Sequence, residues 1–563
     1  MNVSDFVVEQ LHSMGVRRAF GIVGGGIAYF YNSIIKSAIK LHQFRHESGA
    51  GFAATEAYFS EGKPTVVFTT TGPGLLNALT GICAAKWEGA KVVMLSAASS
   101  PDQRGKWPIQ ETSHFTYPCS GLLSGGGLFD LSVQVESPEE LAVIFHRLAA
   151  GLSGPGGFIA RISLPASIQT ASIEVDSTQW QQDYGPAPAI CASASMIEQC
   201  AARLRDETFA IWLGYGAVND TELCIRLARM TGARVFSSCR AKGIFPENDP
   251  LYLGVTGIGG HESVIDYMVN ERPDWVLVLG SRLGEATSFW DHRMLPGQGF
   301  IQVDIDREVL GSAFPQCQTV AIQSEIALFL QMLMDRLEPS WFESRKIASV
   351  TNYTMVNTAR SSSPEASASP ARVSPLRLMS TIQKEIVDGS DALIMSECGN
   401  AFLWMNHHLR FSEPRRYRTS SFFGAMGHFS AGVVGAALAL QKKTVAVVGD
   451  GSFLMHNEVT TAVKYKVPVV WIVLNDAGYG ICRSGFSQLG LIDEEMDFDE
   501  VDFVAMARAQ GGNGLTITGA DSISDSIKEA MRAKEPFVLD VKIDLAMSPS
   551  LLSRIESLRK AES

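Results

Sequence analysis

The chain has 563 residues, enough for about three or four domains of roughly 150 residues each. Hydrophobic residues make up 46% and charged residues 19%, an ordinary well-packed composition, and no apolar run is long enough to span a bilayer. The net charge of −12 argues against nucleic acid as a main partner, because such partners favour basic surfaces.

The first third of the chain alternates short apolar runs with amphipathic or Ala-rich stretches, which favours a parallel sheet covered on both faces. It opens on a predicted amphipathic helix, in which Asp5 and Glu9 stand where a secretory signal would be apolar. None of the nine cysteines forms a CxxC pair, so we expect free thiols and a cytoplasmic protein. The strands expected here are Arg18–Ile22, Thr65–Thr69, Lys91–Leu95 and Gly157–Leu164.

Two more units of the same kind are expected to follow a first domain over residues 1–170. They cover residues 188–340 and 376–545, separated by a Ser/Pro/Ala-rich linker over 345–375, and a tail over 546–563 reads as a surface helix or a lid. The fold class predicted is therefore α/β, with three doubly wound parallel-sheet domains. Their expected strands include Phe209–Leu213, Ala233–Phe236, Trp275–Leu279, Gly299–Val303, Ala392–Ser396, Thr444–Val448, Val467–Leu474 and Phe537–Val541.

Residues 444–480 read as strand, Gly-rich turn, helix, strand and turn. Asp450 follows the first of these strands and the pair Asn475–Asp476 follows the second, so their oxygens should meet at one sheet edge. Such oxygen ligands suit Mg²⁺ or Ca²⁺ rather than zinc. Because Gly449 and Gly451 allow close approach of the backbone to an anion, a magnesium diphosphate is the expected ligand.

This stretch resembles the thiamine-diphosphate signature of acetolactate synthases, pyruvate oxidases and related decarboxylases, which is GDG, a gap of about two dozen residues, and NN. The resemblance implies Mg²⁺ ligands from the Asp450 and Asp476 side chains and from the backbone carbonyl of Gly478. The chain departs from the signature in its slightly shorter gap and in having Asp476 for the second Asn, which adds negative charge beside a diphosphate. The alternative is a GDG turn that merely ends a strand.

A second stretch, residues 44–82, resembles the pyrimidine-binding domain of the same family, in which an HE pair opens an Ala/Gly-rich helix and a TxGPG turn follows the next strand. The resemblance makes Glu47 the catalytic glutamate, which helps the cofactor's aminopyrimidine to act as a base, and places Pro73 of the turn at the cofactor. The alternative for Glu47 is a carboxylate stabilised by a helix N-terminus.

Other cofactor contacts are implied by segments that resemble the family. Met426 would hold the cofactor bent, or else fill a core, and the Gly424 carbonyl would meet the aminopyrimidine. Gly399 and Asn400 would contact the diphosphate, or form a surface turn. The Ser452 hydroxyl would bind the diphosphate or cap a helix.

Three further positions complete the expected site. Gly25, in a GGG turn that resembles the family's PGG loop, would line the site opposite the metal. Gln110 would reach the site from a loop that resembles the FQE stretch of acetolactate synthases, as a catalytic residue. Tyr479 directly follows the metal turn and is expected at the cofactor. Cys482 stands where the decarboxylase branch has a catalytic glutamate, which disfavours simple decarboxylation.

The resemblance implies a cofactor between the first domain of one subunit and the third domain of another, in a homodimer or homotetramer. The reaction it implies is decarboxylation of a 2-oxo acid, with pyruvate the expected donor, and transfer of the acyl carbanion to an aldehyde or ketone. A decarboxylase or acyltransferase of the same family, a flavin-containing oxidase and a catalytically silent homologue remain alternatives. FAD or another nucleotide could bind the central domain, where Gly257, Gly259 and Gly260 are compatible with either ligand.

Overall fold

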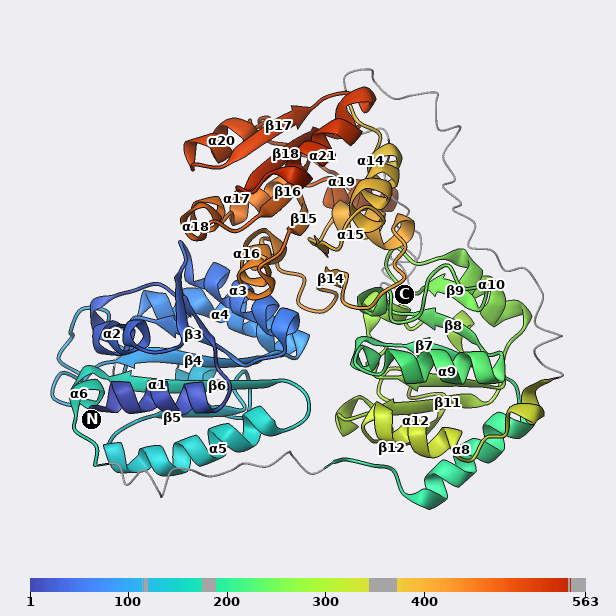
Figure 1. The fold of residues 1–563 in the computed structure, drawn as a ribbon, viewed down its shortest axis with the longest axis horizontal. Helices are drawn as coiled ribbons and strands as arrows, with labels where there is room; N and C mark the ends of the chain where they lie inside the picture. Colours follow the sequence, from blue (N-terminus) through green and yellow to red (C-terminus); the bar gives the residue numbers. More distant parts are fainter. Residues whose placement is uncertain (114, 116–119, 175–188, 344–371, 545–546, 548–563) are drawn as a thin grey trace.

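The computed structural model describes residues 1–113, 115, 120–174, 189–343, 372–544 and 547. The chain forms three lobes, each built on a six-stranded parallel sheet (Figure 1). Hydrophobic side chains pack on both faces of every sheet, which confirms the predicted α/β class with three doubly wound domains. The predicted linker, except for its last residues, and nearly all of the predicted tail lie outside the described residues, so the domain bounds stay predictions.

The first lobe has the strand order β2-β1-β3-β4-β6-β5. Its inner strands are continuous apolar runs because helices cover both faces. The strands are β1 (Arg18–Gly21), β2 (Lys40–Gln43), β3 (Thr65–Thr69), β4 (Lys91–Ala98), β5 (Leu131–Gln134) and β6 (Phe158–Pro165). The helices are α1 (Val3–Ser13), α2 (Ala28–Lys36), α3 (Glu47–Glu61), α4 (Pro73–Glu88), α5 (Leu141–Ser153) and α6 (Ala166–Thr170).

The central lobe has the order β12-β11-β10-β7-β8-β9, which is the order of dinucleotide-binding folds read along the sheet. Its strands are β7 (Phe209–Leu213), β8 (Arg234–Ser237), β9 (Tyr252–Val255), β10 (Trp275–Leu279), β11 (Gly299–Asp304) and β12 (Gln318–Gln323). Its helices are α8 (Ala194–Asp206), α9 (Thr221–Thr231), α10 (Glu262–Asn270), α11 (Glu285–Ser288) and α12 (Ile326–Met334).

The third lobe has the order β14-β13-β15-β16-β18-β17. Its strands are β13 (Leu393–Ser396), β14 (Tyr417–Thr419), β15 (Thr444–Gly449), β16 (Val469–Asn475), β17 (Asn513–Ile517) and β18 (Phe537–Lys542). Its helices are α14 (Pro375–Ile382), α15 (Asn400–His408), α16 (His428–Leu440), α17 (Asp450–Met455), α18 (Val459–Tyr465), α19 (Gly480–Leu489), α20 (Phe503–Ala509) and α21 (Ile523–Arg532).

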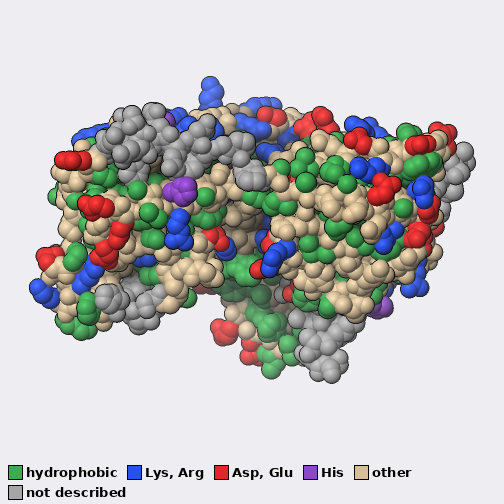
Figure 2. All heavy atoms as spheres, turned by 90° about the horizontal axis from the view of Figure 1, so that it is seen from below, with side chains coloured by type: hydrophobic (Ala, Val, Ile, Leu, Met, Phe, Trp, Pro, Cys, Tyr) green, Lys and Arg blue, Asp and Glu red, His purple; other side chains and the backbone are tan. Residues whose placement is uncertain are grey.

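The first and third lobes share one hydrophobic core, which runs from α3 and α4 into α16 and the β15–β16 region. Helices α3 and α16 lie side by side where the lobes meet (Figure 1). They approach closely because α16 carries glycine at the contact: a Cβ on Gly435 would lie 2.5 Å from the Cα of Ala53. The face seen from below carries scattered side chains of both charge signs (Figure 2).

Candidate active site

The turns that follow β15 and β16 bring two carboxylates together. Asp450 is the first residue of α17 and is 1% exposed, and Asp476 comes directly after β16. One Asp450 oxygen accepts the Gly451 N–H at 2.7 Å and the other accepts the Asp476 N–H at 3.1 Å. The convergence that the sequence predicts for this sheet edge is therefore present.

Neither carboxylate has enough positive charge around it to offset its burial. Burial raises the pKa of Asp450 from 3.8 to about 6, although backbone N–H groups oppose the shift. Burial and the nearby Asp450 charge raise the pKa of Asp476 to about 7, with Arg483 opposing. The Arg483 guanidinium lies 3.7 Å from Asp476 and also pairs with Asp497. One buried and one half-buried carboxylate, side by side, fit a bound divalent cation with oxygen ligands.

The predicted third ligand, Gly478, lies in a turn that is fixed by a neighbouring segment. The Tyr479 N–H donates to the Met496 carbonyl at 2.9 Å, and the Phe498 N–H donates to the Ala477 carbonyl at 3.0 Å. These bonds hold Ala477 in the left-handed region at φ 52°. Across the described residues, no group of three or more His, Cys, Asp and Glu side chains could hold a metal ion, so a backbone ligand such as Gly478 would have to complete the set.

Met426 and Tyr479 meet over Gly451. A Cβ on Gly451 would lie 3.0 Å from the Tyr479 ring and 3.3 Å from the Met426 methyl group. Glycine is therefore the residue that this turn can accommodate. A Cβ on Gly424, two residues before Met426, would meet no atom within 4 Å, so the backbone there borders open space. The structure therefore places Met426, which is expected to hold the cofactor bent, beside the predicted metal turn.

The turn after β13 joins the same cluster. A Cβ on Gly480, next to Tyr479, would lie 2.8 Å from Nδ2 of Asn400. Oδ1 of Asn400 is buried without a hydrogen-bond partner, which leaves a polar atom for a ligand. Gly399 caps the helix that Asn400 begins. Ser452 is buried in α17 and its hydroxyl interacts with Cys398, while Gly449, which borders open space, occupies the helix cap.

Glu47 lies in a second cluster, in the first lobe. It is the first residue of α3, is 9% exposed, and accepts a hydrogen bond from Nδ2 of Asn77 at 3.2 Å. A Cβ on Gly74 would lie 3.2 Å from the Glu47 carboxylate, so the turn that contains Pro73 packs against it. Pro73 is the first residue of α4, where its missing N–H costs nothing.

Gln110 and the GGG turn lie against the same Thr70–Gly74 turn. The Thr71 hydroxyl donates to Oε1 of Gln110 at 3.4 Å, and a Cβ on Gly72 would lie 3.0 Å from the Gln110 Cβ. Gln110 is exposed and has a left-handed backbone, at φ 56°. In the GGG turn, Gly24 packs on Thr70 and Gly25 borders open space.

In the described part of one chain, Glu47 and the metal turn share no direct bond, although the residues on either side of Glu47 contact the segment after α17. Among the described residues, no hydrogen bond or ion pair joins Glu47 to the Asp450–Tyr479 region. Sequence reasoning missed the residues that link the two lobes, notably Glu56, which forms two hydrogen bonds with Arg418, and Glu458, which binds the backbone before Glu47. Their partners lie hundreds of residues away, so no local motif reveals them.

All three lobes match domains of one known enzyme family. The N-terminal TPP binding domain of thiamine pyrophosphate enzymes matches residues 1–117, their central domain matches 197–333, and their C-terminal TPP binding domain matches 397–541. The chain belongs to the thiamine pyrophosphate enzymes.

Its relatives in this family include acetolactate synthases. A probable acetolactate synthase large subunit of Methanocaldococcus jannaschii is 25% identical over 97% of this chain and 92% of its own length. The acetolactate synthase isozyme 1 large subunit of Escherichia coli K12 is 26% identical over 96% and 94%. A putative thiamine pyrophosphate-containing protein, YdaP of Bacillus subtilis, is 25% identical over 95% and 91%. The similarity thus spans nearly the whole chain.

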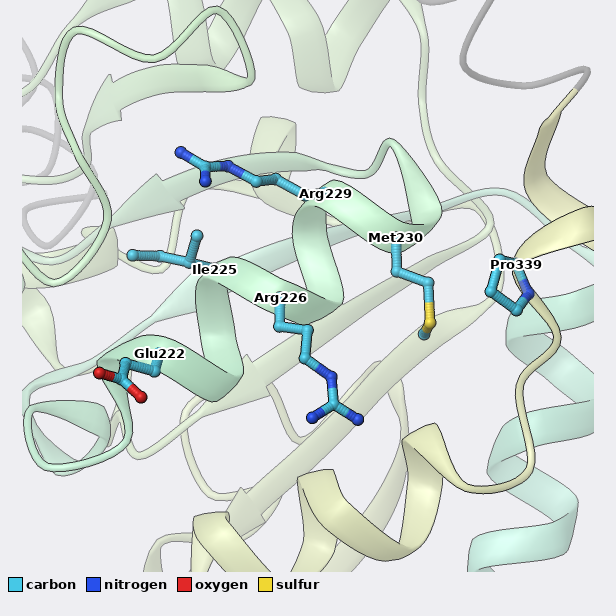
Figure 3. Close-up of a pocket in the computed structure, with 6 residues that line it drawn as sticks. All are labelled: Glu222, Ile225, Arg226, Arg229, Met230 and Pro339. Carbon is cyan, nitrogen blue, oxygen red and sulfur yellow. The ribbon is translucent and has the colours of Figure 1, made fainter.

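The central lobe contains a hollow of about 640 Å³, on the surface of α9 (Figure 3). It is lined by Glu222, Ile225, Arg226, Arg229, Met230 and Pro339. None of these is a predicted site residue. Gly257 is explained by packing, because a Cβ there would lie 2.7 Å from the Ala286 and Thr287 backbone, so binding of FAD or another nucleotide in this lobe stays a prediction. No helix within the described residues is long and apolar enough to cross a membrane.

Proposed function

We propose that the protein is a thiamine-diphosphate- and Mg²⁺-dependent carboligase. It decarboxylates a 2-oxo acid, with pyruvate the expected donor, and joins the acyl unit to an aldehyde or ketone. The observation that carries the proposal is the pairing of buried Asp450 with half-buried Asp476 at the edge of the third sheet, in a thiamine pyrophosphate enzyme whose relatives include acetolactate synthases.

In this proposal the third lobe holds the diphosphate end of the cofactor. Asp450, Asp476 and the Gly478 carbonyl would bind Mg²⁺, because hard oxygen ligands suit this ion. The Ser452 hydroxyl and the Asn400 side-chain amide would donate hydrogen bonds to the diphosphate. When bound, thiamine diphosphate supplies a carbon nucleophile and an electron sink for the donor's decarboxylation.

The remaining roles fall to residues that shape the reacting end of the site. Glu47 would hold a proton at the pyrimidine ring, with Asn77 orienting its carboxylate. Met426 and Tyr479 would form an apolar wall over Gly451 that excludes water. Gln110 would present its amide from an exposed loop, where it could meet the substrate or the acceptor.

We further propose that each active site combines Glu47 of one subunit with Asp450 of another. Within the described part of one chain, Glu47 forms no direct bond with the metal turn, which is consistent with this arrangement. Exposed apolar side chains near both clusters support it, since Ile109, next to Gln110, is 93% exposed and Met455, at the end of α17, is 61% exposed.

Complementation between two inactive variants tests the arrangement. When Glu47→Gln and Asp450→Ala chains are dissociated and reassociated together, statistical mixing should restore about a quarter of the wild-type activity, because half of the dimers then contain one intact pair. Mixtures as inactive as the separate variants would place both residues of a site on one chain.

Product analysis tests the reaction. The protein is incubated with pyruvate, thiamine diphosphate and Mg²⁺, first alone and then with a panel of aldehydes and 2-oxo acids. The proposal expects acetohydroxy acids or acyloins that depend on both cofactors. Free acetaldehyde as the main product throughout would instead identify a decarboxylase. An oxidase would need bound flavin, so the absence of flavin absorbance from the purified protein would exclude that alternative.

A further inference from the structure

The turn between α17 and α18 reaches from the third lobe to the segment that carries Glu47. Glu458 lies in this turn and is 1% exposed. Its two carboxylate oxygens accept the Arg45 N–H at 3.2 and 3.3 Å, and the Thr461 hydroxyl donates to it as well. Gly49 makes room for this carboxylate, because a Cβ there would lie 2.9 Å from Glu458 Oε1. A third-lobe side chain thus binds the backbone two residues before Glu47.

His456 in the same turn binds the other side of Glu47. Its Nε2 lies 3.0 Å from the Ser48 hydroxyl, and that hydroxyl also lies 2.8 Å from Nδ1 of His46. The His46 and His456 rings meet edge to face, with their centroids 4.9 Å apart. The Ser48 N–H donates to His46 Nδ1, which caps the start of α3. The residues immediately before and after Glu47 are therefore both held by this network.

Glu47 itself points away from the network, toward Asn77 and Gly74. The turn therefore fixes the backbone from which Glu47 projects and leaves its carboxylate available. We propose that Glu458 and His456 are positioning residues, which act on the reaction through Glu47. This inference rests on the proposed function for the role of Glu47. The hydrogen bonds that link Glu458 and His456 to the segment around Glu47 are present in the chain without cofactor.

The charges around the turn agree with this role. Burial raises the pKa of Glu458 to about 7, opposed by the Thr461 hydroxyl and by the Arg45 N–H and side chain. Burial, together with the His46 ring, lowers the pKa of His456 to about 4, so this histidine is neutral, and its tautomer sets the direction of its hydrogen bond with the Ser48 hydroxyl. Since α17 begins at Asp450, the helix expected at the metal leads directly into the turn that holds Glu47 in place.

Hydrogen exchange in the cofactor-free protein tests whether Glu458 holds the backbone before Glu47. Glu458→Ala should speed exchange of the Arg45 and His46 amides by about tenfold or more, because a buried acceptor is lost. Glu458→Gln keeps an acceptor oxygen and should exchange nearly as slowly as the wild type. Glu529→Ala, at an exposed position on α21, is the control and should change nothing in this segment. Unchanged exchange in Glu458→Ala would overturn the proposal.

Kinetics of the protein with thiamine diphosphate and Mg²⁺ test the link to Glu47. Glu458→Ala should lower kcat by about tenfold with the donor KM within about twofold, as expected for lost alignment of a reacting group. In a Glu47→Gln background the same substitution should reduce the residual rate by less than about twofold, because the two residues act as a unit. A full tenfold loss in that background would show that Glu458 acts independently of Glu47 and would overturn its positioning role.

A milder variant covers the case in which Glu458→Ala folds poorly. Ser48→Ala removes only the hydroxyl between His46 and His456 and should give smaller changes of the same kind in exchange and in kcat. Normal exchange together with normal kcat in Ser48→Ala would contradict the role of His456. If the wild type fails to bind thiamine diphosphate, the proposed function fails, while the exchange data still decide whether the turn holds this segment.

Discussion

The first and third lobes are built to the same plan, yet they carry different chemistry. Numbered from the first strand of each lobe, both sheets run 2-1-3-4-6-5, whereas the central sheet runs 3-2-1-4-5-6 in one direction. Helix α3 follows the second strand of the first lobe and α16 follows the second strand of the third, and these equivalent helices pack against each other. The shared order is consistent with a distant internal duplication.

The turns at equivalent positions differ in their side chains. After the third strand of the first lobe comes Gly72–Pro73–Gly74, which has no carboxylate, whereas the third lobe has Gly449–Asp450–Gly451. The helix after the second strand begins with Glu47 in the first lobe and with His428 in the third. In the proposed function, the shared topology supplies an equivalent sheet edge in each lobe, and a few residues decide which part of the cofactor that edge would bind.

The sharpest test of this difference is at Glu47. Glu47→Gln should lower kcat by about 10²–10⁴-fold, because it removes the group that exchanges a proton with the pyrimidine. Stability and thiamine diphosphate affinity should stay close to wild type, as measured by thermal melting and calorimetry. Glu9→Gln, on the exposed side of α1, is the control. A kcat within a few fold of wild type would remove Glu47 from the mechanism.

A second test removes a buried ion pair that joins the first and third lobes. Glu56 on α3 is fully buried and pairs with Arg418 at 2.8 and 2.9 Å, and His428 lies 3.1 Å away. Glu56→Gln should destabilise the fold by about 3–5 kcal/mol, because it leaves the Arg418 charge buried without its partner. Denaturant unfolding measures this loss, and Glu535→Gln at an exposed position is the control. A loss below about 1 kcal/mol would show that the pair does not hold the lobes together.

The same pair makes the fold sensitive to acid. Burial alone would raise the pKa of Glu56, but Arg418 and His428 lower it from 4.5 to about 2. The folded protein therefore binds this proton less readily than the unfolded chain does, so the stabilisation is complete above about pH 4.5 and is lost as the pH falls toward 2. In Glu56→Gln this part of the acid sensitivity should disappear, which unfolding curves across that pH range would show.

Sequence reasoning found the inner strands of all three sheets and missed the edges. Each predicted strand matches an inner strand to within three residues, and the six strands not predicted are β2, β5, β9, β12, β14 and β17, which are the edge strands. Inner strands are continuous apolar runs because both faces and both neighbours are covered. Edge strands such as β2 (Lys40–Gln43) and β12 (Gln318–Gln323) are partly exposed and polar, and β14 has only three residues, so no apolar run marks them.

The candidate site likewise has one part that could be predicted from sequence and one part that could not. Asp450, Asp476 and Gly451 could be placed beside one another from sequence, because each follows a strand whose neighbour is also recognisable. The hydrogen-bond network around Glu47 could not be predicted from sequence. Ser48 and His456 are 408 positions apart, and Arg45 and Glu458 are 413 apart, so only the packing of α3 on α16 brings them together.

A third test compares the two carboxylates of the metal turn. Asp450→Ala should weaken Mg²⁺-dependent binding of thiamine diphosphate by about 100-fold or more, because it removes an oxygen ligand at the centre of the site. Asp476→Asn keeps an oxygen ligand and removes one charge beside the diphosphate, so binding should stay within about tenfold of wild type. Calorimetric titration with Mg²⁺ present measures both. Equal losses in the two variants would show that charge, rather than the number of ligands, governs the site.

The smallest expected effect concerns the glycines that let equivalent helices of the two lobes meet. Gly435→Ala should cost about 1–3 kcal/mol of stability, because the added methyl group would lie 2.5 Å from the Ala53 Cα and would push α16 away from α3. Gly485→Ala is the matched control, since it is also helical but meets nothing within 4 Å, and it should be neutral or stabilising by up to about 1 kcal/mol. Because α16 begins next to Met426 and α3 begins at Glu47, a shift at this crossing should also lower kcat in Gly435→Ala more than the loss of stability accounts for. A destabilised variant with normal kcat would mean that the crossing supports the fold alone, and that the positions of Met426 and Glu47 are set at the helix ends.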